Sequence, residues 1–160
     1  MSTITDEELR AGAAGAYGPE AATELLIRTG HANRYARRDE HGNAWLDFTA
    51  AAEDVWPGGT LSGGERRIVA VAVSLSGYVP AAPTTDDDDT LSSWWAAFSL
   101  YEVLPGLDRA NLARVLAAIA HGGGSHEHHP DPVVFDINGN PSLAPDRNAP
   151  LPALYPWPQD

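Results

Sequence analysis

The sequence has no cysteine, so disulfide bonds, thiolate metal ligands and cysteine nucleophiles are all excluded. It has no lysine either, because all ten basic residues are arginines. A phosphate-binding Gly-x-x-x-x-Gly-Lys-Ser/Thr loop is therefore absent, since that loop reaches its nucleotide through the lysine. No apolar run approaches the ~18–20 residues of a membrane-spanning helix, and residues 1–8 lack the basic and apolar regions of a signal peptide. These absences favour a cytoplasmic protein.

Positive charge is scarce as well. The 22 acidic side chains outnumber the ten basic ones and give the chain a net charge of −12. Nucleic acids and anionic membranes attract basic surfaces, so neither is an expected partner. An acidic surface can instead steer a basic protein partner toward it, although the same charge also serves simple solubility. With 160 residues, 43% of them hydrophobic, the chain has the length and composition of one globular domain.

Capping residues and apolar spacing predict six helices. The first covers about 6–15 after a Thr5–Glu8 capping box, and the second opens at Pro19 and stops at Gly30. The third covers about 48–55 behind Asp47, and the fourth covers 62–76 behind a second capping box. The last two cover about 91–103 and 108–121.

The apolar residues of three of these helices indicate where the core lies. Residues 68–75 are apolar on every side, which favours a central buried helix, although their β-branched residues would also suit a strand. In 91–103 the large residues recur at helical spacing, and we expect its aromatic residues in the core rather than on a partner-binding face: Leu91, Trp94, Trp95, Phe98 and Tyr101. In 108–121, Leu107 is expected to pack on Leu112, with the buried face made by Leu112, Val115, Leu116 and Ile119.

Two regions depart from this helical pattern. The turn residues of 40–43 lie between Tyr35–Asp39 and Ala44–Phe48, which predicts a small β-hairpin. After Ser125 repeated prolines forbid long regular elements, and 133–137 is expected as one short edge strand. We find no internal repeat. We therefore expect a mainly α fold, a compact single-domain helical bundle of five to six helices with a small β-hairpin. Residues 1–124 form this domain, and residues 125–160 form a His- and Pro-rich C-terminal arm.

The segment Leu61-Ser62-Gly63-Gly64-Glu65-Arg66-Arg67 carries the clearest motif. From residue 61 to residue 75 it resembles the signature segment of ABC-type ATPases. The resemblance implies that Ser62, Gly63 and Gly64 contact a nucleotide phosphate held by an opposing subunit, which would make the chain a nucleotide-responsive fragment. The phosphate loop and the apolar strand ending in Asp-Glu are both missing. The alternative is a capping box whose glycines allow close packing at a helix start, and we favour it.

A second group of residues has the chemistry of a metal site. Histidines gather around the end of the last predicted helix, and imidazole is a common ligand of Zn²⁺ and Ni²⁺. The candidate ligands are His121, His126, His128 and Asp131, with Glu127 and His129 nearby. The spacing is not that of the His-Glu-x-x-His motif, and a loop rich in glycine and proline is a poor scaffold for fixed geometry. The alternative is a solvated loop that binds metal adventitiously.

The remaining candidates are partner-binding residues: the acidic run Asp86, Asp87, Asp88 and Asp89, and the arm residues Tyr155 and Trp157. No Gly-x-Ser-x-Gly elbow and no recognisable Ser/His/Asp set nominates an enzyme class. Segments 20–27, 45–48, 61–67 and 107–111 together resemble short proteins of high-GC bacteria and their phages to which no activity is assigned, so the resemblance supplies no site residues. The leading expectation is a non-enzymatic acidic interaction protein, such as an accessory, regulatory or immunity-type factor. The alternatives are a metal-binding protein and the nucleotide-responsive fragment.

Overall fold

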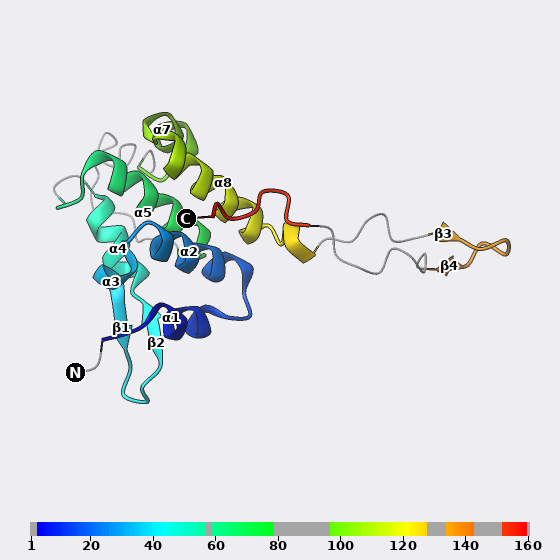
Figure 1. Cartoon of the computed structure of the whole chain (residues 1–160), viewed down its shortest axis with the longest axis horizontal. Helices are drawn as coiled ribbons and strands as arrows, with labels where there is room; N and C mark the ends of the chain where they lie inside the picture. Colours follow the sequence, from blue (N-terminus) through cyan, green and yellow to red (C-terminus); the bar gives the residue numbers. More distant parts are fainter. Residues whose placement is uncertain (1–2, 57–58, 79–96, 128–133, 143–151, 160) are drawn as a thin grey trace, which may run out of the picture.

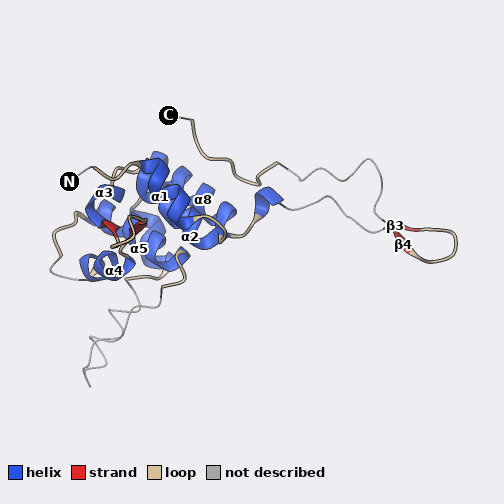
Figure 2. Ribbon diagram, turned by 90° about the horizontal axis from the view of Figure 1, so that it is seen from below, coloured by secondary structure: helices blue, strands red, loops and turns tan. Residues whose placement is uncertain are grey.

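The structure is a computed structural model that describes residues 3–56, 59–78, 97–127, 134–142 and 152–159. In these residues the fold is mainly helical, with seven α-helices, two short 3-10 helices and two antiparallel two-stranded sheets. Figures 1 and 2 show the helices gathered into one bundle and the β3–β4 hairpin drawn well away from them. The expected mainly helical class with a small hairpin is therefore confirmed. The C-terminal arm and the division at residue 125 stay predictions, because 128–133 and 143–151 lie outside the described residues.

The first two helices are α1 (Asp6–Ala13) and α2 (Tyr17–Arg28). Both bonds of the predicted Thr5–Glu8 capping box are present at the start of α1. The prediction that α2 opens at Pro19 is wrong by two residues, because Ala16 is the N-cap and Pro19 lies in the first turn. The first-turn N–H groups have no helical acceptor, so a proline there removes no bond. Gly30 follows the helix with φ of 77°.

The predicted hairpin is confirmed with a small change at its start. A single helical turn, α3 (Ala32–Tyr35), precedes β1 (Ala36–Arg38), which pairs with β2 (Ala44–Leu46). The pairing is antiparallel and sets Ala36 opposite Leu46. Asp47 then caps α4 (Phe48–Val55) by accepting a hydrogen bond from the N–H of Ala50 at 3.0 Å. The hairpin lies against α1, and Ala44 and Leu46 are buried there.

Helix α5 (Gly63–Leu75) forms the centre of the core, as the all-apolar run predicts. Every residue from Ile68 to Val73 is buried, and the helix contacts α2, α4, α7 and α8. The chain leaves the helix at Ser76 and turns at Gly77, whose φ is 76°. The helical prediction is thus confirmed over the strand alternative. A helix that is apolar all round gains its stability from burial on several sides at once.

The predicted helix over 91–103 is wrong in the part that the structure describes. Ser99 has extended backbone and starts a separate four-residue helix, α7 (Leu100–Val103), which passes into the 3-10 turn η1 (Leu104–Gly106). Serine favours the start of a helix over its middle, and Pro105 prevents continuation of an α-helix. Phe98 packs against the core as expected, but Tyr101 is 83% exposed. Leu91, Trp94 and Trp95 lie outside the described residues.

Helix α8 (Arg109–Gly122) is capped by Asp108 as predicted and is followed by the 3-10 turn η2 (Ser125–Glu127). Its predicted buried face is wrong at Leu116, which is exposed, whereas Val115 and Ala118 are fully buried. The helix turns a face of small residues toward α2, where a Cβ on Gly122 would lie 3.5 Å from the Cβ of Ala21. Close approach through small residues, rather than the largest apolar stripe, orients α8.

The predicted edge strand over 133–137 is wrong at its C-terminal end. The strand β3 (Val134–Phe135) is only two residues long and pairs antiparallel with β4 (Pro141–Ser142). Asp136 ends the strand because its backbone and carboxylate close a turn with Asn138, Gly139 and Asn140. The chain therefore forms a second hairpin, a feature that was not predicted.

Candidate functional site

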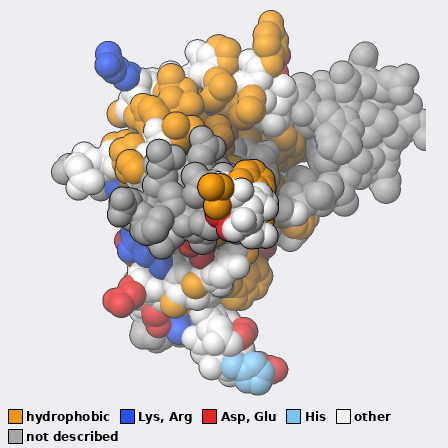
Figure 3. Space-filling model, turned by 90° about the vertical axis from the view of Figure 1, so that its right-hand side faces the viewer, with side chains coloured by type: hydrophobic (Ala, Val, Ile, Leu, Met, Phe, Trp, Pro, Cys, Tyr) orange, Lys and Arg blue, Asp and Glu red, His pale blue; other side chains and the backbone are white. Residues whose placement is uncertain are grey.

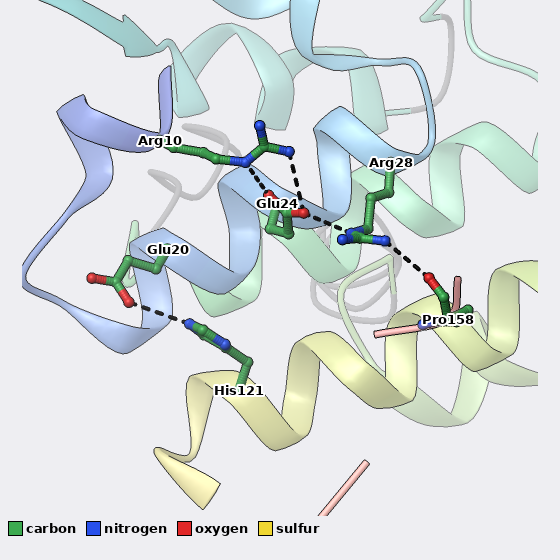
Figure 4. Close-up of polar contacts among 6 residues, drawn as sticks. All are labelled: Arg10, Glu20, Glu24, Arg28, His121 and Pro158. Atoms are coloured by element: carbon green, nitrogen blue, oxygen red, sulfur yellow. Dashed lines mark hydrogen bonds and ion pairs between the residues drawn. The ribbon is translucent and has the colours of Figure 1, made fainter. Parts of the chain in front are cut away.

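A pocket of about 240 Å³ lies where α1, α2, α8 and the C-terminal segment meet. Its wall combines two alanines and an arginine at α1 with two carboxylates of α2, an imidazole of α8 and one indole ring. The lining residues are Arg10, Ala13, Ala14, Glu20, Glu24, His121 and Trp157. Figure 4 shows the polar groups of this region directed toward one another across α1, α2 and α8. Pockets with an apolar wall and a few converging polar groups are the usual places for ligands.

Glu24 is the electrostatic centre of the pocket wall. Arg10 of α1 donates its Nε–H to Glu24 at 2.7 Å, and Arg28, one turn along α2, donates its Nε–H to the same carboxylate at 2.6 Å. Burial raises the pKa of Glu24, but the hydrogen bonds from Arg10 and Arg28 outweigh burial, and the pKa is lowered overall. Glu24 therefore stays ionised and fixes both guanidinium groups.

Glu20 lies one turn before Glu24 and forms the second polar contact of the pocket. It accepts the N–H of Gly15 at 2.7 Å through one oxygen, and Nε2 of His121 lies 3.2 Å from the other. The Gly15 bond, followed by the His121 contact, lowers the pKa of Glu20. The carboxylate–imidazole pair joins α2 to α8 across 101 residues of sequence. Together, the Glu20–His121 contact and the ion pairs of Glu24 join α1, α2 and α8.

Two of the predicted metal ligands, His121 and His126, lie side by side. Their rings stack with centroids 4.1 Å apart at an interplanar angle of 14°. A metal lies in the plane of each imidazole that binds it at ~2.0–2.1 Å, so two stacked, nearly parallel rings do not share one ion in this arrangement. The rings of Tyr17 and His126 are nearly perpendicular, with centroids 5.2 Å apart, and the Tyr17 hydroxyl donates a hydrogen bond to Glu127.

The metal prediction as a whole stays a prediction. His128 and Asp131 lie outside the described residues, and within the described ones no group of three His, Asp or Glu side chains is placed to hold an ion. The buried Nδ1 of His126 has no hydrogen-bond partner there.

The predicted partner-binding residues have different positions. Asp86, Asp87, Asp88 and Asp89 lie outside the described residues. Tyr155 is exposed. Trp157 is half-buried, packs against the core and lies under the Arg28 guanidinium, whose central carbon is 5.2 Å from the ring centroid. The structure therefore places Trp157 against this chain's own surface.

The signature-like segment begins α5 and contains the expected capping box. Ser62 accepts the N–H of Glu65, and Glu65 accepts the N–H of Ser62 at 2.7 Å. The idea that both glycines permit close packing is wrong at Gly64, where an added Cβ would meet no atom within 4 Å. Nucleotide binding at Ser62, Gly63 and Gly64 stays a prediction.

A second candidate surface is the β3–β4 hairpin, which sequence reasoning missed. Phe135 is 68% exposed and Ile137 is 100% exposed. The pattern that marks this hairpin is Asp-x-x-Gly-Asn at 136–140, which also occurs at 39–43 in the β1–β2 hairpin. This recurring turn pattern is the sequence signal from which the second hairpin could have been predicted. A further set of exposed apolar residues, Leu100 and Tyr101, belongs to α7, and hydrophobic side chains gather over the upper part of the face in Figure 3.

Comparisons with protein-family models, with curated proteins and with solved structures found no match to the chain. None of the described helices combines the length and the apolar character needed to cross a lipid bilayer.

Proposed function

We propose that this protein is a non-enzymatic acidic interaction protein that binds a basic protein partner through the β3–β4 hairpin of its C-terminal arm. Such a protein acts as an accessory, regulatory or immunity-type factor, and as part of the proposal we place it in the bacterial cytoplasm. The observation that carries the proposal is the exposure of Phe135 and Ile137 on a turn that hydrogen bonds hold in one shape.

The two hairpins of the chain make this exposure informative. In both, an aspartate accepts the N–H groups two and four residues later, and a glycine occupies the left-handed region. The β1–β2 hairpin carries Arg38 just before its aspartate and Glu40 just after it. The β3–β4 hairpin carries Phe135 and Ile137 at these same two positions. The turn does not require apolar residues there, so an apolar contact outside the described residues accounts best for them.

The rigidity of the turn lowers the cost of binding. Asp136 donates its N–H to Asn140 at 2.9 Å, and its carboxylate accepts the N–H groups of Asn138 at 2.8 Å and Asn140 at 2.9 Å. A side chain on a preformed turn loses less conformational freedom when it docks than one on a loose chain. Two apolar groups presented in this way match a shallow apolar groove on a partner.

Charge favours a basic partner. The chain has a net charge of −12, and several of its ten arginines already pair with carboxylates of the same chain. These are Arg10, Arg28, Arg34, Arg37 and Arg38. The surplus carboxylates accelerate encounter with a positively charged protein, and salt screens that attraction.

The test compares the wild-type chain with a variant that copies the first hairpin onto the second, Phe135→Arg with Ile137→Glu. This variant keeps the turn and the net charge. Each is used to capture proteins from native lysate at about 0.15 M and about 0.5 M salt, where screening is stronger. We expect the wild type to retain one basic protein at low salt, and the variant to retain less than about a tenth of it.

The matched control is Tyr101→Ser, which changes an even more exposed aromatic side chain on α7 and should leave retention unchanged. The captured protein is then identified, purified and titrated against the same three chains. Equal affinity for wild type and for the Arg/Glu variant, or no specific retention at either salt concentration, contradicts the proposal.

A further inference from the structure

The C-terminal segment 152–159 contacts α2, α8 and η2 over long sequence separations, through Leu154, Trp157 and Pro158. Trp157 packs against the core and forms one wall of the pocket. The N–H of Leu154 lies 3.3 Å from Oγ of the buried Ser125 in η2. Figure 4 shows Pro158 at the end of the chain of contacts that begins at Glu24. The segment therefore occupies a defined binding site, called the seat below, which is formed by Arg28 of α2, His121 of α8 and Ser125 of η2.

Arg28 binds this segment through a hydrogen bond and through the face of its guanidinium group. Its Nη1–H donates to the backbone carbonyl of Pro158 at 2.9 Å, and its guanidinium lies over the Trp157 ring at 5.2 Å. Glu24 holds the same guanidinium from the other side through Nε at 2.6 Å. A guanidinium fixed in this way is preorganised for one ring and one carbonyl, so little further freedom is lost on binding.

The sequence of the bound segment indicates which kind of peptide this site binds. Trp157 lies between Pro156 and Pro158, and proline favours the extended polyproline conformation in which carbonyls point outward and side chains are spaced. Proline-rich segments elsewhere dock in aromatic-lined grooves of their receptors. Here the indole is on the ligand and the planar cation on the receptor. We propose that this seat is a recognition site for a proline-flanked tryptophan peptide of another protein, and that residues 152–159 occupy it as an intramolecular ligand.

The intramolecular ligand belongs to the same chain as its site, so it competes with any free peptide that binds there. Twenty-four residues, 128–151, separate η2 from the segment. A tethered ligand competes at an effective concentration that the length and stiffness of its connection set. A partner peptide therefore binds only when its own affinity or concentration exceeds that competition, so the seat selects strong ligands.

The test uses the full chain and a fluorescent peptide with the sequence of residues 152–160. Trp157→Ala weakens the intramolecular ligand and leaves the receptor side chains in place. We expect this variant to bind the peptide at least about tenfold more tightly than the wild-type chain does, because the competitor is removed. A peptide with alanine in place of its tryptophan should not bind.

Two further variants in the Trp157→Ala background separate recognition from general damage. Arg28→Gln removes the cation and the donor, and should weaken peptide binding at least tenfold. Arg38→Gln removes a guanidinium of the β1–β2 hairpin that pairs with Glu8 at 2.8 Å and lies outside this site, and should leave peptide binding within about twofold of the Trp157→Ala chain. No saturation by about 1 mM peptide, or equal binding of the peptide that lacks tryptophan, overturns the proposal.

A measurement on the wild-type chain avoids variants that fold poorly. The indole N–H resonance of Trp157 is assigned in the NMR spectrum by its loss in Trp157→Ala. Excess unlabelled peptide should move that resonance toward its position in an unfolded chain, as the segment is displaced. A resonance that does not move while the peptide saturates the chain shows a different binding site. This outcome leaves the β3–β4 proposal untouched, since that proposal depends on Phe135 and Ile137 alone.

Discussion

The two hairpins of this protein share one turn and differ in everything around it. Each has a three-residue loop between an aspartate and an asparagine, and the N–H of Asp39 reaches Asn43 at 3.0 Å as that of Asp136 reaches Asn140 at 2.9 Å. The glycines at the fourth position, Gly42 and Gly139, have φ of 89° and 79°. This is the loop type in which a type I turn is followed by a left-handed residue, and glycine adopts that conformation without strain.

The surroundings of the two turns are opposite. The strands of the first hairpin lie against α1, where Leu46 is 6% exposed, and its two flanking positions carry charge. The second hairpin has strands of two residues and carries Phe135 and Ile137 in the open. A short two-stranded hairpin is marginal by itself in water. The comparison shows that residues close together in the sequence determine the turn. The packing that makes a hairpin part of the core depends on other elements of the fold.

The comparison is tested most strongly by the same kind of truncation in both hairpins. Leu46→Ala removes a buried side chain and should lower the free energy of unfolding by about 2–4 kcal/mol, through lost burial and the cavity left behind. Ile137→Ala removes a fully exposed side chain and should change it by less than about 0.5 kcal/mol. Urea unfolding followed by circular dichroism measures both. Comparable losses in the two variants would show that the second hairpin is packed as firmly as the first.

A smaller effect tests whether α1 is what secures the first hairpin. A Cβ on Gly12 would lie 2.0 Å from the carbonyl oxygen of Ala44, so Gly12→Ala must push α1 and β2 apart. We expect a loss of about 1–3 kcal/mol in the free energy of unfolding, the usual range for overpacking. The control is Gly64→Ala, also helical, where an added Cβ meets nothing within 4 Å. That variant should be neutral or stabilised by up to about 1 kcal/mol, because alanine is the better helix former. Equal melting temperatures for both variants would argue against this contact.

The sequence predicts those parts of the fold that depend on neighbours in the chain. The capping boxes at Thr5 and Ser62 and the cap at Asp108 all involve residues three apart, and all three are confirmed. The predicted burial of residues 68–73 is also confirmed, because a helix that is apolar on every side must be buried on every side. The β1–β2 hairpin follows from its turn residues, and the same reading applied to 136–140 would have found the second hairpin.

The predicted helix over 91–103 failed at local signals, Ser99 and Pro105, whereas other features could not be predicted because tertiary packing chooses between local options. The orientation of α8 depends on small residues of α2, so Leu116 is exposed although it belongs to a helical stripe. The pocket depends on pairs such as Glu20 with His121, which lie 101 residues apart. The seat of Trp157 on Arg28 is equally non-local. Nothing in the local pattern of either residue predicts its partner, because any of the many carboxylates or aromatic rings would satisfy the same chemistry.

The smallest expected effect is on the pH dependence of stability and concerns Asp39 and Asp136, the aspartates of the two turns. Hydrogen bonds from the side chain and backbone of Asn43 lower the pKa of Asp39, and the backbone and then the side chain of Asn140 do the same for the pKa of Asp136. A carboxyl group whose pKa is lower in the folded than in the unfolded state stabilises the fold above the unfolded value of about 3.9. That contribution is lost as the pH falls through the folded pKa.

Both aspartates should therefore titrate below the ordinary value when their carboxyl carbons are followed by NMR, because the turn alone sets the shift. The global melting temperature should distinguish them. Asn43→Ala should lower it at pH 7 and have a smaller effect at a pH below the folded pKa of Asp39, where that carboxyl group is protonated in both states. Asn140→Ala should raise the pKa of Asp136 part of the way to normal and leave the melting temperature unchanged at either pH, because the second hairpin opens independently of the core. A global loss of stability from Asn140→Ala at pH 7 would mean that the β3–β4 hairpin is coupled to the helical core, and that its exposed apolar residues belong to the fold rather than to a partner.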